Sequence, residues 1–236
     1  VNSTADTDDG LCSPSAGGCT LREAIQNANA SAAISEIAFS IPGTQTQVIR
    51  PLTPLPPLSR LLTINGYSQP GAVENTVSAG SGNALNSVIK VEIDGGLLST
   101  GNGIKLCAGG TVRGLAIHSF ADAAIAADCG VSNQPVAVLG NYLGLKSDGL
   151  TPAGNGFGVR AEPTDDGRAQ TQFTTGELAI GFAIAAARNL ISANRIAAIA
   201  VAPRQRFVTT SIEGNLIGTD RTGNAPLANA AGIVFT

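Results

Sequence analysis

The sequence contains neither tryptophan nor methionine, and only 13% of its 236 residues are charged. So low a charge excludes a long charged helix or a coiled coil. A disordered chain is excluded as well, because hydrophobic residues make up 43% of the sequence and are spread along its whole length. No apolar run approaches the roughly 20 residues that a membrane-spanning helix needs. We therefore expect a folded protein without a transmembrane segment.

Basic residues and metal ligands are also scarce. The 14 lysines and arginines are scattered, with Arg204 and Arg206 as the one close pair, and the formal net charge is −3. A nucleic-acid-binding surface needs basic residues gathered on one stripe, so we expect no nucleic-acid partner. The single histidine, His118, and the lack of any Cys-x-x-Cys pair argue against a zinc site. We expect no cofactor.

What the sequence does contain is a long internal repeat. Residues 115–159 recur 74 positions later as residues 189–233, and Gly-Asn-Tyr-Leu-Gly at 140–144 returns as Gly-Asn-Leu-Ile-Gly at 214–218. A finer ladder is formed by Leu115, Asn141, Asn189 and Asn215, at separations of 26, 48 and 26 residues. The repeating unit is therefore about 24 to 26 residues, since the gap of 48 is two steps. A chain rich in glycine and asparagine that repeats at this length predicts a solenoid.

The ladder also predicts how its side chains lie. Two positions after each ladder residue comes an aliphatic residue, which we expect to point inward as part of one stacked column: Ile117, Leu143, Ile191 and Ile217. The asparagines are expected to stack inside the turns, each hydrogen-bonding the next. An alternative is a row that faces a ligand, but Leu115 at the same position suits packing better.

Residues 20–29 form the one convincing helix of the sequence. Thr20 and Glu23 fit a capping box, in which each side chain satisfies a free backbone N–H. Leu21, Ala24, Ile25 and Ala28 follow with helical spacing and give one apolar stripe. We expect this helix to cover the open end of the first coil.

From residue 37 onward the pattern is one of short strands broken by glycine, asparagine and proline. The expected strands are 37–41, 47–50, 61–65, 88–94, 104–106, 112–118, 124–126, 136–143, 158–160, 178–180, 189–192, 198–201, 211–217 and 233–235. Residues 162–175 are expected to form a lateral loop. Short strands at this spacing without intervening helices predict an all-β fold of parallel strands around a solenoid axis. We expect a single domain over residues 1–236, with a disulfide loop and capping helix in 1–30 and coils in 31–236.

Four cysteines stand at positions 12, 19, 107 and 129. Cys107 and Cys129 follow similar short strands by three and four positions, so stacked coils would bring them within bridging range. Cys12 and Cys19 would close a short loop beside the helix. Two disulfides indicate an oxidising compartment. The sequence begins without a basic and apolar leader, so we expect a mature exported chain, secreted or at the cell surface, whose signal peptide has been removed.

Three motifs together resemble a family of exported bacterial proteins with an N-terminal CSLREA-type motif. They are Asp-Asp-Gly-Leu-Cys at 8–12 with Cys-Thr-Leu-Arg-Glu-Ala-Ile at 19–25, the segment 61–71, and the Gly-Asn-x-(Leu/Ile)-Gly rungs. Thr20 stands where the family motif has serine. The resemblance covers nearly the whole chain and implies a single-stranded right-handed parallel β-helix of pectate-lyase-like fold, export, and frequent attachment within large surface proteins. It implies no defined reaction, because a fold alone supplies none.

Four residues are weak candidates for a binding site. Asp94 and Arg113 precede glycines in similar strand contexts, so stacking would make them neighbours on adjacent coils. They would form either an acid beside a cation in a groove or a solvent-side ion pair of about 0.2–1 kcal/mol. His118 would need an orienting partner to act as a general base, and only Asp122 is close in sequence. The alternative is a surface or turn histidine.

Two acidic pairs are weak candidates for calcium. The pairs Asp8-Asp9 and Asp165-Asp166 could bind the ion through carboxylates and carbonyls. The spacing of the N-terminal pair does not fit a helix-loop-helix calcium loop, and ordinary turn chemistry is the alternative.

Enzymes on this fold need catalytic sequence motifs that are mostly missing from this chain. Pectin-cleaving hydrolases share Asn-x-Asp, Asp-Asp, Gly-His-Gly and Arg-x-Lys motifs, of which only Asp-Asp occurs. Aromatic platforms for sugars are few, with only Tyr67 and Tyr142 as tyrosines. The sequence therefore favours a non-catalytic scaffold for adhesion, binding or assembly, with a polysaccharide or another surface ligand as partner. The alternatives are a polysaccharide-processing lyase or hydrolase and a self-assembling extracellular fibre.

The last residues of the sequence follow a strand pattern. Residues 232–235 repeat the apolar pattern of the preceding coil, and no second helical cap follows them. We expect Ile233 and Phe235 to lie in a rung. Their coil would be covered by another copy of the chain, through end-to-end association, or by residues of a longer parent protein.

Overall fold

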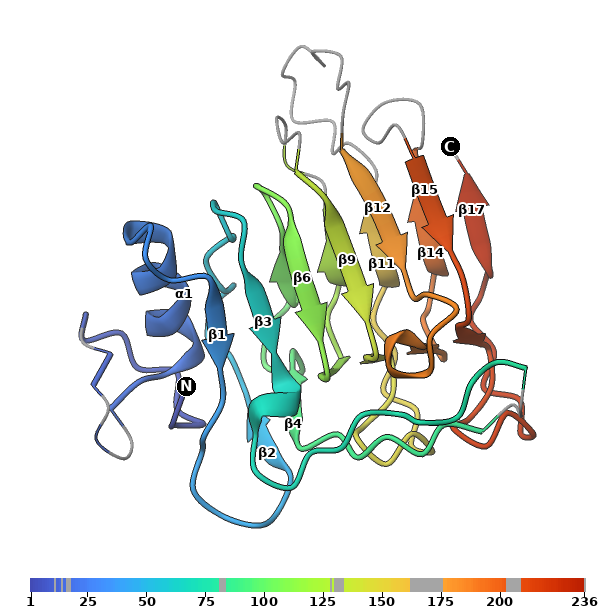
Figure 1. Ribbon diagram of the computed structural model, residues 1–236, viewed down its shortest axis with the longest axis horizontal. Coiled ribbons are helices and arrows are strands. Elements are labelled where there is room, and N and C mark those ends of the chain that lie inside the picture. Colours follow the sequence, from blue (N-terminus) through green and yellow to red (C-terminus); the bar gives the residue numbers. More distant parts are fainter. Residues whose placement is uncertain are drawn as a thin grey trace.

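The computed structural model describes residues 1–10, 12–13, 15, 18–80, 84–127, 129, 134–161, 176–202 and 209–235. The loop predicted at 162–175 lies outside these ranges. In the described part, seventeen strands form three sheets in which every pairing between strands is parallel, beside one α-helix (Figure 1). None of the described helices has the length and apolar character required to cross a membrane.

Each of the three sheets collects one strand from successive passes of the chain. The first sheet contains β1 (Glu36–Ala38), β3 (Thr63–Asn65), β6 (Gly110–Arg113), β9 (Val136–Leu139), β12 (Glu177–Ile180) and β15 (Thr209–Ile212). The second sheet contains β2 (Gln47–Ile49), β4 (Val91–Asp94), β7 (Ala116–His118), β10 (Tyr142–Leu143), β13 (Leu190–Ile191) and β16 (Leu216–Ile217). The third sheet contains β5 (Ile104–Lys105), β8 (Ala123–Ala126), β11 (Phe157–Ala161), β14 (Ala197–Val201) and β17 (Ile233–Phe235).

From β3 to β17 the chain visits the first, second and third sheets in strict rotation. One pass through the three sheets is called a coil below. Each strand pairs with its counterpart one coil earlier, so the coils lie side by side in sequence order (Figure 1). This order is consistent with the predicted parallel β-helix. Ile233 and Phe235 continue the third sheet in β17, as expected for a rung.

In the structure, each of three predicted strands is divided into two separate strands. Residues 112–118, 136–143 and 211–217 are divided at Gly114, Gly140 and Gly214, whose φ angles are +70°, +65° and +69°. This left-handed region is open to glycine at little cost. The chain uses it to turn from the first sheet to the second. The prediction of single strands was wrong, because an uninterrupted apolar pattern can pass through a corner.

The interior of the stack is apolar. Ile117, Leu143 and Ile191 are fully buried and pair in register across β7, β10 and β13, which confirms the predicted inward column. Ile217 continues the column in β16 but is only half-buried, since no described coil lies on its far side. Around this column, side chains from all three sheets form one hydrophobic cluster.

The helix α1 (Leu21–Ala30) lies beside β1 at one end of the stack (Figure 1). Its capping box is present: the Thr20 side chain accepts from the Glu23 N–H, and the Glu23 side chain accepts from the Thr20 N–H. Leu21 and Ile25 are fully buried against the first coil. Arg22 adds a buried ion pair with Asp6 at 2.8 Å. The helix therefore covers this end, as predicted.

Both predicted disulfides are formed. One joins Cys12 to Cys19 and the other joins Cys107 to Cys129, and no free cysteine remains among the described residues. The second bridge links the segments that follow β5 and β8, which are adjacent strands of the third sheet. It therefore ties two neighbouring coils together.

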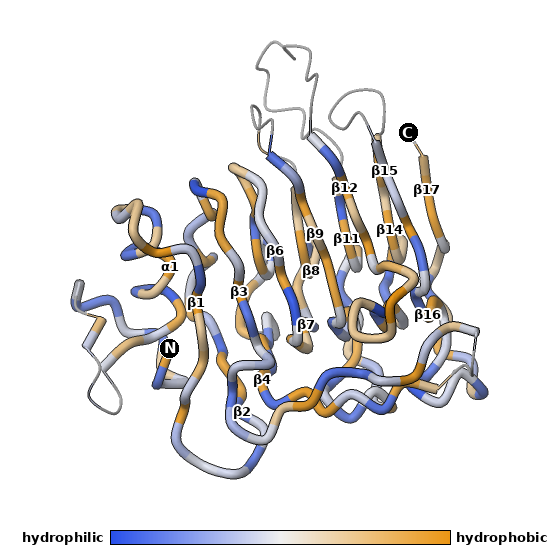
Figure 2. The backbone as a smooth tube through the Cα atoms, viewed as in Figure 1, coloured by the Kyte–Doolittle hydropathy of each residue, from blue (hydrophilic) through white to orange (hydrophobic). Residues whose placement is uncertain are grey.

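A long excursion, described over residues 69–80 and 84–90, leaves the stack between η1 (Gly66–Ser68) and β4. It runs along the outer side of the second sheet, and Figure 2 shows apolar segments within it. With that sheet it encloses a second apolar cluster of Leu85, Ile89, Ala116, Tyr142, Leu145, Leu190 and Leu216. Asn75 fixes it by donating to the Ala185 carbonyl beside η2 (Ala185–Ala187) at 2.8 Å. The outer face of the second sheet is thus largely covered by the protein itself.

Candidate functional site

The densest group of ionisable side chains lies at the edge of this covered face. Glu92 and Asp94 alternate along β4 and so project to the same side of the second sheet. His118 on β7 pairs in register with Asp94. Arg50, directly after β2, reaches the same place. We call Arg50, Glu92, Asp94, His118 and Ser119 the His118 cluster.

His118 lies between two carboxylates and is only 2% exposed. Its Nε2 is 3.3 Å from Glu92 Oε2, and its Nδ1 is 3.0 Å from Ser119 Oγ and 3.6 Å from Asp94 Oδ1. Asp94 Oδ2 in turn accepts from Arg50 Nε at 3.0 Å. Each member of the cluster thus has a partner on a neighbouring strand or turn.

Glu92 is the most strongly perturbed acid of the cluster. Burial by itself would raise the pKa of Glu92, but hydrogen bonds from His118 and from Ser147 outweigh burial and lower the pKa to about 2. One of these bonds is the Ser147 N–H donating to Glu92 Oε1 at 2.8 Å. Glu92 is therefore a carboxylate at any ordinary pH, and it anchors the loop that follows β10.

The contacts run from Glu92 to His118 and from His118 to Ser119, which is the order of an acid–histidine–serine relay. Ser119 also has a φ of +64°, a strained value for a non-glycine residue. However, Ala193, which follows Ser119 by 74 residues in the repeat, has a φ of +62° at the equivalent corner. The backbone conformation of Ser119 therefore belongs to the corner of the coil and is no sign of a nucleophile.

Of the four predicted site residues, the structure brings together Asp94 and His118. Arg113 lies elsewhere, on β6 of the first sheet, where its partner in register is Asn65. It forms an ion pair with Glu74 and lies 5.4 Å from the centre of the Tyr67 ring. The expectation that Asp94 and Arg113 are neighbours was wrong, because similar strand contexts do not show which of three sheets a strand joins.

Asp122 also lies apart from His118. Its carboxylate pairs with Arg160 of β11 at 2.8 Å, beside the third sheet. The partner of His118 that sequence reasoning missed is Glu92. The signal for it was the alternation Glu-Ile-Asp at 92–94, which places two acids on one face of a strand.

The N-terminal calcium candidates take part in ordinary loop contacts. Asp8 accepts from Gln26 Nε2 at 3.1 Å, and the Asp9 N–H donates to Glu23 Oε1 at 3.2 Å. Within the ranges that the structure describes, no three His, Cys, Asp or Glu side chains gather as a metal site. Asp165 and Asp166 lie outside those ranges.

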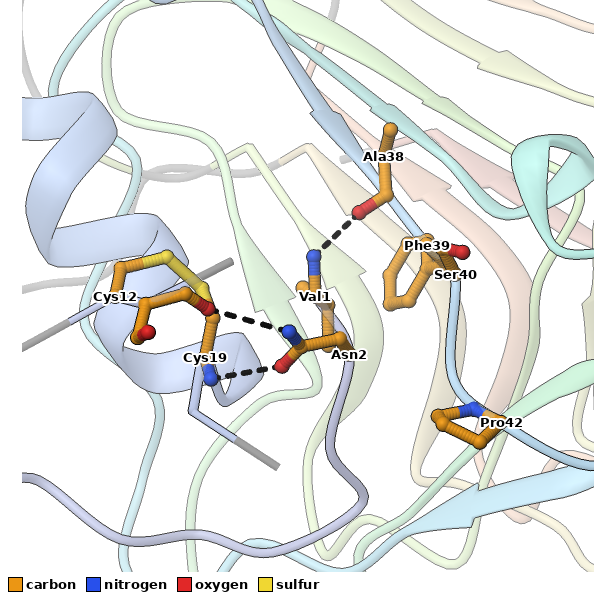
Figure 3. A pocket seen from close by; sticks show the side chains of 9 residues that line it. Val1, Asn2, Cys12, Cys19, Ala38, Phe39, Ser40 and Pro42 are labelled. Atoms are coloured by element: carbon orange, nitrogen blue, oxygen red, sulfur yellow. Dashed lines mark hydrogen bonds between the residues drawn. A yellow bond between two sulfur atoms is a disulfide. The ribbon is translucent and has the colours of Figure 1, made fainter. Parts of the chain in front are cut away.

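A cavity of about 520 Å³ lies between the N-terminal disulfide loop and residues 38–42, at the start of the first sheet (Figure 3). Its lining is Val1, Asn2, Cys12, Ser13, Cys19, Ala38, Phe39, Ser40 and Pro42. Asn2 uses its side chain within the protein, because Oδ1 accepts from the Cys19 N–H at 2.8 Å. No acidic, basic or histidine side chain lines this cavity, but the Val1 α-amino group does, and it donates to the Ala38 carbonyl at 2.6 Å.

The asparagines predicted from the repeat form a continuous ladder inside the corner between the first and second sheets. Asn141 Oδ1 accepts from the Leu115 N–H at 3.1 Å, and Asn189 Oδ1 accepts from the Asn141 N–H at 2.9 Å. Asn215 Oδ1 then accepts from the Asn189 N–H at 3.2 Å. Asn141 and Asn189 are fully buried. The prediction of stacked, mutually bonded asparagines is confirmed. The expectation that the 48 residues from Asn141 to Asn189 make two steps was wrong, because β10 pairs directly with β13 and these residues form a single, longer coil.

A second ladder, missed from the sequence, fills the corner between the second and third sheets. Asn155 Oδ1 accepts from the Phe120 N–H at 3.0 Å, Asn194 Oδ1 from the Asn155 N–H at 3.2 Å, and Asn229 Oδ1 from the Asn194 N–H at 2.9 Å. Its spacings along the chain are 39 and 35 residues, because loops of different length separate its members. The recurrence of Asn155 as Asn229 in the repeat was the available signal.

Comparison with known proteins leaves the function to be argued from these residues. No family model, no curated protein and no solved structure matches the chain.

Proposed function

We propose that the chain is a right-handed parallel β-helix, secreted or displayed at the cell surface, and that it acts as a scaffold for adhesion, binding or assembly. The observation that carries the proposal is a regular row of small outward side chains on the first sheet. In register from coil to coil, the row consists of Thr63, Thr111, Ala137, Ala179 and Ser211. The alternate residues of the same strands, such as Val112 and Val138, are fully buried. Such a face suits contact with an extended partner.

The right-handed winding of the coils and the location outside the cytosol are inferred from general rules. Crossovers between parallel strands of one sheet are right-handed in about 98% of cases, and the CSLREA-type resemblance implies the same hand. Two disulfides favour an oxidising compartment outside the cytosol. The same resemblance implies export.

The alternative is a polysaccharide-processing enzyme, and the His118 cluster is the observation that favours it. Two carboxylates flank a buried histidine there. A glycosidase, however, needs one carboxylic acid with a raised pKa to protonate the leaving group. The pKa of Glu92 is instead lowered to about 2, and Asp94 is bonded to Arg50 and to the Gly96 N–H. Glu92 therefore does not suit the part of the proton-donating acid of a glycosidase.

The test is binding of the purified protein to polysaccharides and to intact bacterial surfaces. Thr111→Lys and Ala137→Lys place long charged side chains in the row, and we expect each to weaken binding about ten-fold or more. Leu150→Lys is the matched control, because Leu150 is an exposed loop residue outside the row. Row variants that bind like the wild type would overturn the assignment of this face. Release of reducing or unsaturated sugar ends would favour the enzyme.

A further inference from the structure

The outward row of the first sheet runs across its strands, and therefore along the stack. It holds one small, half-buried side chain per coil, in the order Thr63, Thr111, Ala137, Ala179 and Ser211. Neighbouring strands lie about 4.8 Å apart, so the five side chains span about 19 Å. Figure 1 shows no described segment in front of the middle of these strands. The row is thus an open and evenly spaced track.

The spacing of the row distinguishes between two kinds of extended chain. A polypeptide strand advances only about 3.3 Å per residue, so its side chains do not keep step with the row. The rings of an extended β-1,4-linked glycan recur at nearly the spacing of the strands, because each linkage joins opposite ends of a ring through equatorial bonds. One ring therefore meets one coil along the whole row.

The side chains in and beside the row also suit such a ring. A β-1,4-linked pyranose has two C–H faces and carries its hydroxyls around the edge. The side chains of the row are small enough for a C–H face to lie flat on them. Glu177 lies two positions before Ala179 on β12, so its carboxylate projects on the same side as the row. Glu213 reaches the row too, because it accepts from the Ser211 hydroxyl at 2.8 Å. Carboxylate oxygens accept hydrogen bonds, which hydroxyls at the edge of a ring donate.

The charge beside the row argues against one large class of glycans. Glu36 takes the place of the row residue in β1. Glu36, Glu177 and Glu213 are exposed, and none of them forms an ion pair within the described part of the chain. Arg113, which lies on the same sheet, is already paired with Glu74. The face therefore repels polyanions, and an uncharged glycan fits it best.

We propose that the first sheet binds an uncharged β-1,4-linked glycan, one chain of which lies along the row with one ring on each coil. The C–H faces of the rings contact the small side chains, and the edge hydroxyls donate to the carboxylates of Glu36, Glu177 and Glu213. No aromatic side chain stands in the row, so the affinity depends on how many rings lie in register. The inference rests on the scaffold role proposed above and names its ligand.

Oligosaccharides of known linkage test the spacing. Isothermal titration of the purified chain with cellohexaose, a β-1,4-linked glucose hexamer, should show saturable binding with a Kd below about 1 mM. Maltohexaose has the same sugar and no charge, but its α-1,4 linkage coils the chain, so it should bind at least about ten-fold more weakly. Cellobiose has only two rings and should also bind about ten-fold more weakly.

A pair of polymers with the same backbone tests the charge. Hydroxyethyl cellulose is uncharged and should retard the protein in native affinity electrophoresis, whereas carboxymethyl cellulose should not. Glu177→Lys combined with Glu213→Lys should allow carboxymethyl cellulose to bind, and added salt should reverse this gain because it screens exposed charges. Asp8→Lys with Asp9→Lys makes the same change in net charge at exposed positions outside the face and should leave carboxymethyl cellulose unbound.

The row itself is tested by Ala137→Lys. This variant should bind cellohexaose about ten-fold or more weakly, because the long side chain lifts the rings off the sheet. Leu150→Lys adds the same side chain at an exposed position outside the row and should bind cellohexaose as the wild type does.

Equal affinity for cellohexaose and maltohexaose, no binding of cellohexaose up to about 1 mM, or equal retardation by the two polymers would each overturn the inference. A surface ligand that protease destroys and cellulase leaves intact would overturn it too, because the partner would then be a protein. The scaffold proposal has a separate readout, the binding of the row variants to intact surfaces. If Ala137→Lys lowers that binding while cellohexaose does not bind, only the glycan inference fails.

Discussion

Glu92 shows how one buried residue couples stability to pH. Its folded pKa of about 2 lies below its ordinary value of 4.5, so the carboxylate form stabilises the fold. The stabilisation is complete above pH 4.5 and is lost as the pH falls toward 2, by an amount on the order of 3 kcal/mol. We expect urea unfolding to reveal this loss between pH 6 and pH 3 in the wild type. In Glu92→Gln the loss should be smaller, and an equal loss in both proteins would contradict the role of Glu92.

Ile191 shows what one position in the inward column contributes. It is fully buried, and its neighbours in register are Leu143 and Ile217. Ile191→Ala should lower the free energy of unfolding by about 2–5 kcal/mol, because the neighbouring coils cannot close the cavity that it opens. Lys146→Ala, at an exposed position, should change it by less than about 0.5 kcal/mol. Chemical denaturation of the two variants checks the difference.

At the scale of elements, the ladders decide how one coil is held on the next. Asn189 accepts from the Asn141 N–H at 2.9 Å and donates to Val138 O and Asn215 Oδ1, both at 2.8 Å. Asn189→Leu leaves the buried Asn141 N–H without an acceptor, at about 1–3 kcal/mol, and the Val138 carbonyl keeps only the Gly181 N–H as donor. We expect it to cost more than Asn215→Leu at the half-buried end of the same ladder. Equal costs in denaturant titrations would show that the ladder does not act as a series of couplings.

The stability of the helix α1 depends on its N-terminal capping box. Thr20→Ala removes the oxygen that accepts from the Glu23 N–H and should cost about 0.5–2 kcal/mol. Thr20→Ser keeps that oxygen. We therefore expect thermal unfolding of the serine variant to match the wild type closely. Early exchange of the helix amides only in the alanine variant would locate the effect.

At the scale of the whole molecule, the excursion couples coils that are far apart. In a plain solenoid each repeat contacts only its neighbours. Here Asn75 reaches Ala185, and the Leu85 N–H donates to the Arg221 carbonyl at 2.7 Å. We therefore expect the excursion and the second sheet to unfold together rather than coil by coil, because an apolar cluster lies between them.

Leu85→Ala tests this coupling. Leu85 is 2% exposed within that cluster, so its truncation should cost about 2–5 kcal/mol. Amide exchange should accelerate together in β10, β13 and β16, although Leu85 belongs to none of them. Leu97→Ala, at a position that is 59% exposed, should leave exchange unchanged. Acceleration confined to residues 84–90 would show that the excursion is only an appendage.

The sequence by itself determined the features that repeat or that lie close along the chain. The inward column was visible because an aliphatic residue stands two positions after each ladder residue, and Ile117 returns as Ile191 in the repeat of 74 residues. The first asparagine ladder was visible from the same repeat, in which Asn141 returns as Asn215. The cap of α1 involves only Thr20 and Glu23, three positions apart, so its physics is local. The pairings Cys12–Cys19 and Cys107–Cys129 follow from short separations of 7 and 22 residues.

The tertiary structure alone decided which sheet each strand joins and what covers the outside. Arg113 and Asp94 have similar sequence contexts but lie in different sheets, on β6 and β4, and Glu92 rather than Asp122 meets His118. The second ladder was hidden because the repeat of 74 residues sets Phe120 against Asn194, so that only Asn155 and Asn229 recur as asparagines. The path of the excursion depends on contacts such as Asn75 with Ala185, 110 residues apart. No local pattern specifies such contacts, because they form only once the stack has brought the coils together.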